Sequence, residues 1–183
     1  MSSKICRDAL WAYDGPLILI KLISIRDNSN KKAELEALRN WIIYEQERVE
    51  EAICTEEYFN VIIENLRNED SLNISALDIL NNLCSVSKKS LKVICSSNLS
   101  LFKIFQKFLL NICLSNPTEK QKAKFVCEII YNILKYSDNC KTLFESLGMV
   151  QIINKIHQLA KEKKIVIIED LTNQIIKITS YKK

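Results

Sequence analysis

An acidic residue followed four positions later by an asparagine recurs at four places in this 183-residue chain. The four asparagines are 42, 50 and 41 residues apart, and each pair lies in an apolar stretch with helical periodicity. A repeat of this length is typical of short helical units that stack, because one unit cannot bury its apolar face alone. The pairs are Glu36/Asn40, Asp78/Asn82, Glu128/Asn132 and Glu169/Asn173.

The chain is poor in the residues that make tight turns. It holds only two glycines and two prolines, while 48% of its residues are apolar. Such a composition leaves little room for hairpins and disfavours a β-sheet fold. We therefore predict an all-α domain that occupies the whole chain.

Apolar residues at helical spacing predict a cycle of short, medium and long helices. The first long helix is expected over residues 31–44, with a separate short helix over 47–54, and another long helix over 71–85. Three residue types mark the boundaries. Thr55 precedes a helical stretch as an N-cap, and Asn116-Pro117-Thr118 marks a loop and the start of a helix, with proline or threonine near its first turn. Gly148 separates two helices where a left-handed residue is needed.

Several stretches of the pattern resemble the armadillo repeat. They include Ala37-Leu-Arg-Asn-Trp-Ile, Tyr58-Phe-Asn-Val-Ile-Ile-Glu-Asn-Leu and Ala76-Leu-Asp-Ile-Leu-Asn-Asn-Leu-Cys. The resemblance implies a right-handed α-solenoid of about four armadillo-like repeats, at approximately 1–44, 45–86, 87–136 and 137–183. It also implies that the third helices line a groove for a partner segment. The family often carries tryptophan four residues before the asparagine, where this chain has acids.

A second, shorter stretch is similar to the helical-repeat region of mitotic-exit and septation-initiation protein kinases. It reads Arg39-Asn-Trp-Ile-Ile-Tyr-Glu-Gln-Glu-Arg-Val-Glu-Glu. This resemblance implies a regulatory or dimerising domain of a larger signalling protein that acts in the cell cycle. No kinase motif accompanies it in this chain.

The eight acid and asparagine residues are the candidate partner-binding groove. Residues four apart share one helical face, and stacking would place the four pairs in register. The asparagines could hold the backbone of a protein or peptide segment, and the acids would favour lysine or arginine on it. A structural ladder that binds no ligand explains the same pattern, and both interpretations stay open.

Aromatic residues near the start of the chain form a second candidate. Trp11 and Tyr13 belong to the first repeat, and an end repeat leaves an apolar face uncovered. They are a candidate end-face interface, through which the chain could form a homodimer. The first unit also lacks its short helix, which is consistent with a partner or a further segment at this end.

Charge is unevenly distributed along the sequence. Residues 1–80 hold 9 basic and 15 acidic side chains, whereas residues 81–183 hold 17 and 7. No acid occurs between Asp78 and Glu119. A solvated face explains the basic half; an adaptor for acidic or phosphorylated ligands is the alternative, and no nucleic-acid motif is present. The candidate patch is Lys88, Lys89, Lys92, Lys103 and Lys107, with Lys120, Lys122 and Lys124 beyond it.

No pattern in the sequence predicts an enzyme, a cofactor or a metal site. Two isolated glycines cannot form a phosphate-binding loop, and His157 is the only histidine. The seven cysteines are scattered without a Cys-x-x-Cys pair, as expected of buried free thiols in a reducing compartment. No apolar run is long enough for membrane insertion. We predict a non-enzymatic protein-interaction scaffold in the cytoplasm, in the nucleus or on the cytoskeleton.

Overall fold

The computed structural model describes residues 4–25, 30–68, 71–96 and 99–180. Apart from one pair of two-residue strands, its regular elements are helices, so the all-α prediction is confirmed. The helices are α1 (Lys4–Trp11), α2 (Gly15–Ser24), α3 (Lys31–Ile53), α4 (Glu56–Glu64), α5 (Ile74–Val86), α6 (Lys88–Ser96), α7 (Leu99–Leu110), α8 (Pro117–Tyr136), α9 (Asp138–Ser146), α10 (Met149–Glu162) and α11 (Val166–Ser180).

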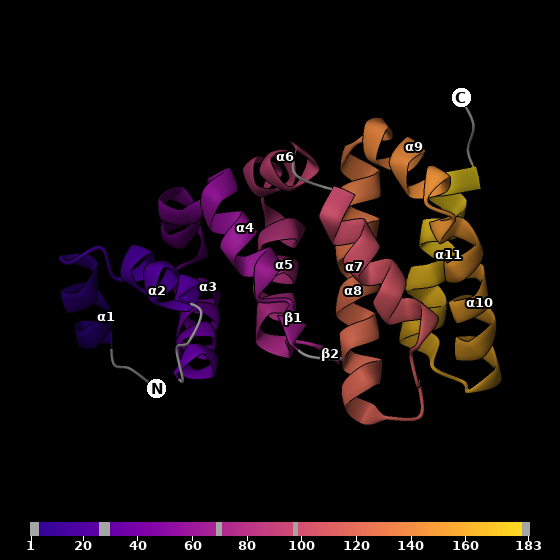
Figure 1. Ribbon diagram of the computed structural model, residues 1–183, viewed down its shortest axis with the longest axis horizontal. Helices are drawn as coiled ribbons and strands as arrows, with labels where there is room; N and C mark the ends of the chain where they lie inside the picture. The colour runs from indigo at the N-terminus through magenta and orange to yellow at the C-terminus, as the bar shows by residue number, and fades with distance from the viewer. Residues whose placement is uncertain (1–3, 26–29, 69–70, 97–98, 181–183) are drawn as a thin grey trace.

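The helices follow one another along the longest axis of the molecule (Figure 1). Four of them carry the acid–asparagine pairs, namely α3, α5, α8 and α11. They pack in that order, α3 against α5, α5 against α8 and α8 against α11. The pairs therefore lie on neighbouring helices, although they are 41 to 50 residues apart in the sequence.

Helix α3 combines two helices that the sequence predicts as separate. Its backbone leaves helical geometry at Glu45, with φ −142° and ψ 45°, between the predicted ranges 31–44 and 47–54. The hydrogen-bonded turns continue on both sides of this residue. The predicted break is thus present as a kink between two helical segments that follow each other directly within α3.

A small strand pair precedes α5 where the sequence predicts helix. β1 (Arg67–Asn68) and β2 (Ser71–Leu72) pair antiparallel. The predicted helix start at residue 71 is therefore wrong. The helix begins at Ile74, because the Asn73 side chain accepts hydrogen bonds from the backbone N–H groups of Ser75 and Ala76 and caps it there.

The predicted helix boundaries at the three marker residues are confirmed. The Thr55 hydroxyl accepts a hydrogen bond from the Tyr58 N–H, and the Asn116 side chain accepts from the backbone at the start of α8. Gly148 has φ 68° between α9 and α10, a conformation that a side chain disfavours. These signals act within a few residues, and the tertiary structure does not override them.

Of the six cysteines whose side chains the structure describes, four are buried, as the sequence predicts. They are Cys54, Cys84, Cys127 and Cys140, whereas Cys95 is half-buried and Cys113 is exposed. Desolvation by burial, with the nearby charge of Glu128, raises the pKa of the Cys127 thiol to about 12. This thiol therefore stays protonated at neutral pH.

Among the described helices, no single one is both long and apolar enough to cross a membrane. The bent pair of α6 and α7 reaches that length and apolarity only when its two helices are counted together.

Candidate functional site

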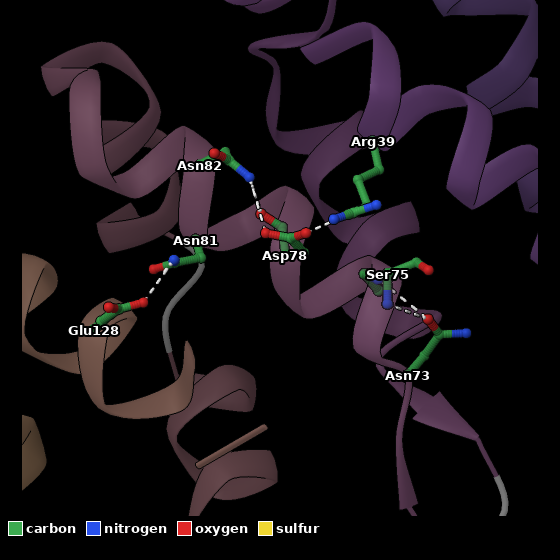
Figure 2. A network of polar contacts seen from close by, with 8 residues as sticks. Arg39, Asn73, Ser75, Asp78, Asn81, Asn82 and Glu128 are labelled. Carbon is green, nitrogen blue, oxygen red and sulfur yellow. Dashed lines mark hydrogen bonds and ion pairs between the residues drawn. The ribbon is translucent and has the colours of Figure 1, made fainter. Parts of the chain in front are cut away.

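The second acid–asparagine pair is tied to the preceding long helix. The Asp78 carboxylate forms an ion pair with the Arg39 guanidinium of α3 (Figure 2). Within α5, the Asn82 amide donates to the Asp78 carbonyl oxygen at 2.8 Å and to the Asp78 carboxylate at 3.0 Å. Only 13% of the Asp78 side chain is exposed, so its charge is largely committed to these partners.

The third acid makes the equivalent contact one helix further along. The Asn81 amide of α5 donates to the Glu128 carboxylate of α8 at 2.8 Å (Figure 2). Lys124, one turn earlier in α8, lies 3.7 Å from the same carboxylate. Because a carboxylate can only accept hydrogen bonds, it is the amide nitrogen of Asn81 that faces Glu128. The buried amide oxygen of Asn81 has no hydrogen-bond partner among the described residues.

These two contacts share one register. Arg39 and Asn81 each directly precede the asparagine of a pair, and each binds the acid of the next long helix. Tyr131 holds that place in α8, but no hydrogen bond joins it to Glu169 in the part of α11 that the structure describes. We call the contacts Arg39–Asp78 and Asn81–Glu128 the lateral ladder. At these two steps the pattern has a structural role.

The first pair differs from the others because both of its side chains are exposed. Glu36 and Asn40 lie on α3, and the described residues provide no ion pair for the Glu36 carboxylate. Lys32 stands one turn earlier without forming one. The first pair therefore presents a carboxylate and an amide that can contact another molecule.

Two pockets meet at Glu36 and Asn40. The larger, which we call the N-terminal pocket, has a volume of about 620 Å³ between α1, α2 and α3. Its wall is mostly apolar, and the tryptophan ring of Trp41 forms part of it. Its lining residues are Leu10, Gly15, Ile18, Leu19, Ala33, Glu36, Ala37, Asn40, Trp41 and Tyr44.

The smaller pocket, which we call the inter-helix pocket, has a volume of about 250 Å³ and is more polar. It extends from Glu36 and Asn40 across α5 to α8. Arg39 and Asp78 of the lateral ladder lie in its wall. Its lining residues are Glu36, Arg39, Asn40, Ile74, Ser75, Asp78, Gln121 and Phe125. The two pockets share Glu36 and Asn40 in their walls, and together their linings include residues of three of the four long helices.

The remaining predicted groove residues lie outside both pockets. Asn82, Asn132, Glu169 and Asn173 are half-buried on α5, α8 and α11, and Glu128 is committed to the lateral ladder. Near Glu169, the His157 ring Nδ1 lies 3.0 Å from the Thr172 hydroxyl and 3.3 Å from the Glu169 carbonyl oxygen. The histidine therefore joins α10 to α11.

The two aromatic residues of the predicted end face have different surroundings. Tyr13 is 74% exposed, whereas Trp11 is half-buried. The Trp11 indole N–H donates to the Glu45 carboxylate at 2.5 Å, and its ring packs edge-on against Trp41 with centroids 5.3 Å apart. The Arg48 guanidinium lies 4.1 Å from the Trp11 ring centre. Trp11 thus connects α1 to α3. Of the two predicted end-face residues, only Tyr13 is exposed enough to contact a partner.

The five lysines of the predicted acidic-ligand patch are all exposed. Three lie on α6 and two on α7. Further along the chain, Lys122 is buried and forms an ion pair with Glu119 at 3.1 Å, while Lys124 pairs with Glu128. Two of the three lysines near the start of α8 are therefore occupied within their own helix.

Sequence reasoning missed Arg39, Asn81 and most of the apolar pocket wall. Arg39 and Asn81 could have been found from their shared place directly before an asparagine of the repeat. Within the described part of the chain, no group of His, Cys, Asp and Glu side chains is placed to hold a metal ion. No protein-family model matches the chain, and no curated protein sequence matches it either.

Proposed function

We propose that this chain is a non-enzymatic protein-interaction scaffold that binds a segment of a partner protein along the groove of its long helices. The architecture we propose is a right-handed α-solenoid of about four armadillo-like repeats. The order of packing, α3 on α5, α5 on α8 and α8 on α11, supports it, because each long helix contacts the next one along the chain.

The observation that carries the binding proposal is the pair of adjoining pockets at Glu36 and Asn40. An apolar volume of about 620 Å³ lies in the range of ligand sites and can hold more than one apolar side chain. Asn40 offers a donor and an acceptor to a peptide backbone, and Glu36 favours a lysine or arginine next to the apolar anchor. The inter-helix pocket would take the continuing backbone.

The test uses a displayed library of random 12-residue peptides selected on the full chain. We expect Ala37→Phe to abolish capture of the selected peptides, because the new ring would fill the N-terminal pocket. Loss of a buried anchor typically costs at least about 2 kcal/mol, which is roughly a thirtyfold loss of affinity. Trp41 lines this pocket and Trp11 packs against Trp41, so binding can be followed by tryptophan fluorescence.

Ala9→Phe is the matched control, because Ala9 is also exposed and lies outside the pocket wall. It should leave capture unchanged. A second selection on Glu36→Lys should replace basic residues by acidic ones in the enriched peptides, whereas Glu64→Lys, at an exposed residue of α4, should not. Equal capture by Ala37→Phe and the unaltered chain would eliminate the proposed groove.

A second candidate function, dimerisation as part of a larger signalling protein, is favoured by one face of α2. Ile18 and Leu22 lie one turn apart on this face, and Ile25 follows directly after the helix; 45%, 37% and 53% of their surfaces are exposed. Contiguous exposed apolar residues often mark an interface. If they pair two copies, light scattering should give a mass near twice 21.2 kDa, and Leu22→Glu should return it to the monomer value. A monomer at all concentrations would exclude this function.

A further inference from the structure

The same kind of side-chain contact occurs at two junctions between neighbouring helical units. Cys54 follows the end of α3, and its Sγ lies 3.8 Å from the Ser90 Oγ in α6. Cys95 near the end of α6 and Cys140 near the start of α9 hold the places of Cys54 and Ser90 at the next junction, and their two side chains interact. Cys95 follows the buried Ile94, as Cys54 follows the buried Ile53.

The receiving positions are equivalent as well. Ser90 and Cys140 each stand three residues after a serine, and their backbone N–H groups donate to the hydroxyls of Ser87 and Ser137 at 3.1 and 3.3 Å. The same contact therefore occurs twice along the chain. In its first copy it joins a thiol to a hydroxyl, and in its second copy it joins two thiols.

We propose that Cys95 and Cys140 are a reversible disulfide site that links α6 to α9. Helix α8 packs against both of these helices. The first copy of the contact, where Ser90 replaces one of the thiols, cannot form such a link. The bond would therefore occur at one repeat junction only.

The exposure of the two thiols indicates which of them reacts first with an oxidant. Cys95 is half-buried and within reach of an oxidant, whereas Cys140 is fully buried. With glutathione disulfide as oxidant, the Cys95 thiolate attacks one sulfur and releases one glutathione thiolate. Cys140, after losing its proton, then attacks the Cys95 sulfur and releases the second glutathione. Two thiols lose two electrons and two protons, and one glutathione disulfide becomes two glutathione molecules.

The surroundings of the pair make this reaction slow at neutral pH. The hydrogen bond with Cys140 and desolvation by burial raise the pKa of the Cys95 thiol above its usual range. Because the thiolate is the attacking form, the reaction should speed up as the pH rises from 7 to 9. A slow reaction also leaves the bond stable to brief changes in redox conditions.

The test is to treat the folded full chain with glutathione disulfide and to digest it without reduction. We expect a linked peptide pair that contains Cys95 and Cys140, a mass lower by two hydrogen atoms, and reversal by dithiothreitol. The oxidised protein should melt at a higher temperature than the reduced one, because the bond joins residues 45 apart in the sequence.

Cys140→Ser is the informative variant, because the chain already tolerates serine at the equivalent residue, Ser90. It should accumulate a glutathione adduct on Cys95, since the second thiol is missing. Cys54→Ser is the matched control and should leave the linked pair unchanged. A wild-type chain that carries glutathione on Cys95 without forming the linked pair, or that reacts only at the exposed Cys113, would overturn the proposal.

Discussion

Phe144→Ala should lower the free energy of unfolding by about 3–5 kcal/mol, the usual cost of removing a buried phenylalanine. Phe144 of α9 is fully buried and packs edge-on against Phe102 of α7, with ring centres 5.6 Å apart. Chemical denaturation followed by circular dichroism measures the loss. The variant also tests the architecture, because in a linear stack the loss of stability should be confined to the helices near the C-terminal end.

The positions of the tryptophans allow that localisation to be measured. Trp11 and Trp41, the only two in the chain, belong to α1 and α3, whereas Phe144 belongs to α9. In Figure 1, α1 and α3 lie at the N-terminal end of the row of helices, far from α9. In a stack with nearest-neighbour contacts, Phe144→Ala should unfold α9, α10 and α11 first. The helical signal should then fall at a lower urea concentration than the tryptophan fluorescence changes.

Phe59→Ala provides the reciprocal control, because Phe59 of α4 is also fully buried but lies nearer the tryptophans. In that variant the fluorescence change should come first or coincide with the loss of helix. If both probes report one shared transition in Phe144→Ala, the chain unfolds as a single cooperative unit. That result would argue against the proposed solenoid, because its repeats are expected to unfold separately.

Helix boundaries could be predicted because their causes are local. Thr55, Asn116 and Gly148 act on backbone groups within three residues, so sequence alone places them. The exception is the start of α5, where β1 and β2 delay the helix until Asn73 caps it. The predicted break between residues 44 and 47 also has a counterpart in the kink at Glu45.

The partners of the acid–asparagine pairs could not be predicted, because they depend on how neighbouring helices are rotated and shifted. The sequence indicates that Asp78 and Asn82 share one face of α5, which the bond between their side chains confirms. It does not indicate that Arg39, from another repeat, reaches Asp78. Only helix packing reveals that this acid is paired and that Glu36 is exposed.

The N-terminal pocket was missed for a similar reason. Its wall combines residues from three helices, and Trp11 closes against Trp41 only because Glu45, at the kink of α3, receives its indole N–H. In the sequence, Trp11 was indistinguishable from an exposed anchor. The orientation of the Trp11 ring depends on the Glu45 carboxylate, which lies 34 positions later in the chain.

Gly15→Ala should be the most damaging single methyl addition at this end of the molecule. A Cβ atom at Gly15 would overlap Cη2 of the Trp41 ring, and would lie 2.8 Å from Cζ3 and 3.0 Å from the Leu10 carbonyl oxygen. Overpacking of this kind typically costs about 1–3 kcal/mol. We expect a loss in that range by urea denaturation, together with a changed tryptophan fluorescence in the folded state, because Trp41 must move.

The cause can be isolated by a second substitution. Trp41→Phe removes the part of the indole that the new methyl group would meet, so Gly15→Ala should cost less in that background, and the difference is the coupling energy. Gly148→Ala is the matched control. Its Cβ would lie 3.7 Å from the nearest side-chain atom, and its cost comes from φ of +68°, which Trp41→Phe cannot relieve. An equal cost of Gly15→Ala in both backgrounds would show that the Trp41 ring does not limit the space at Gly15. The close approach of α2 to α3, which forms one wall of the N-terminal pocket, would then need another cause.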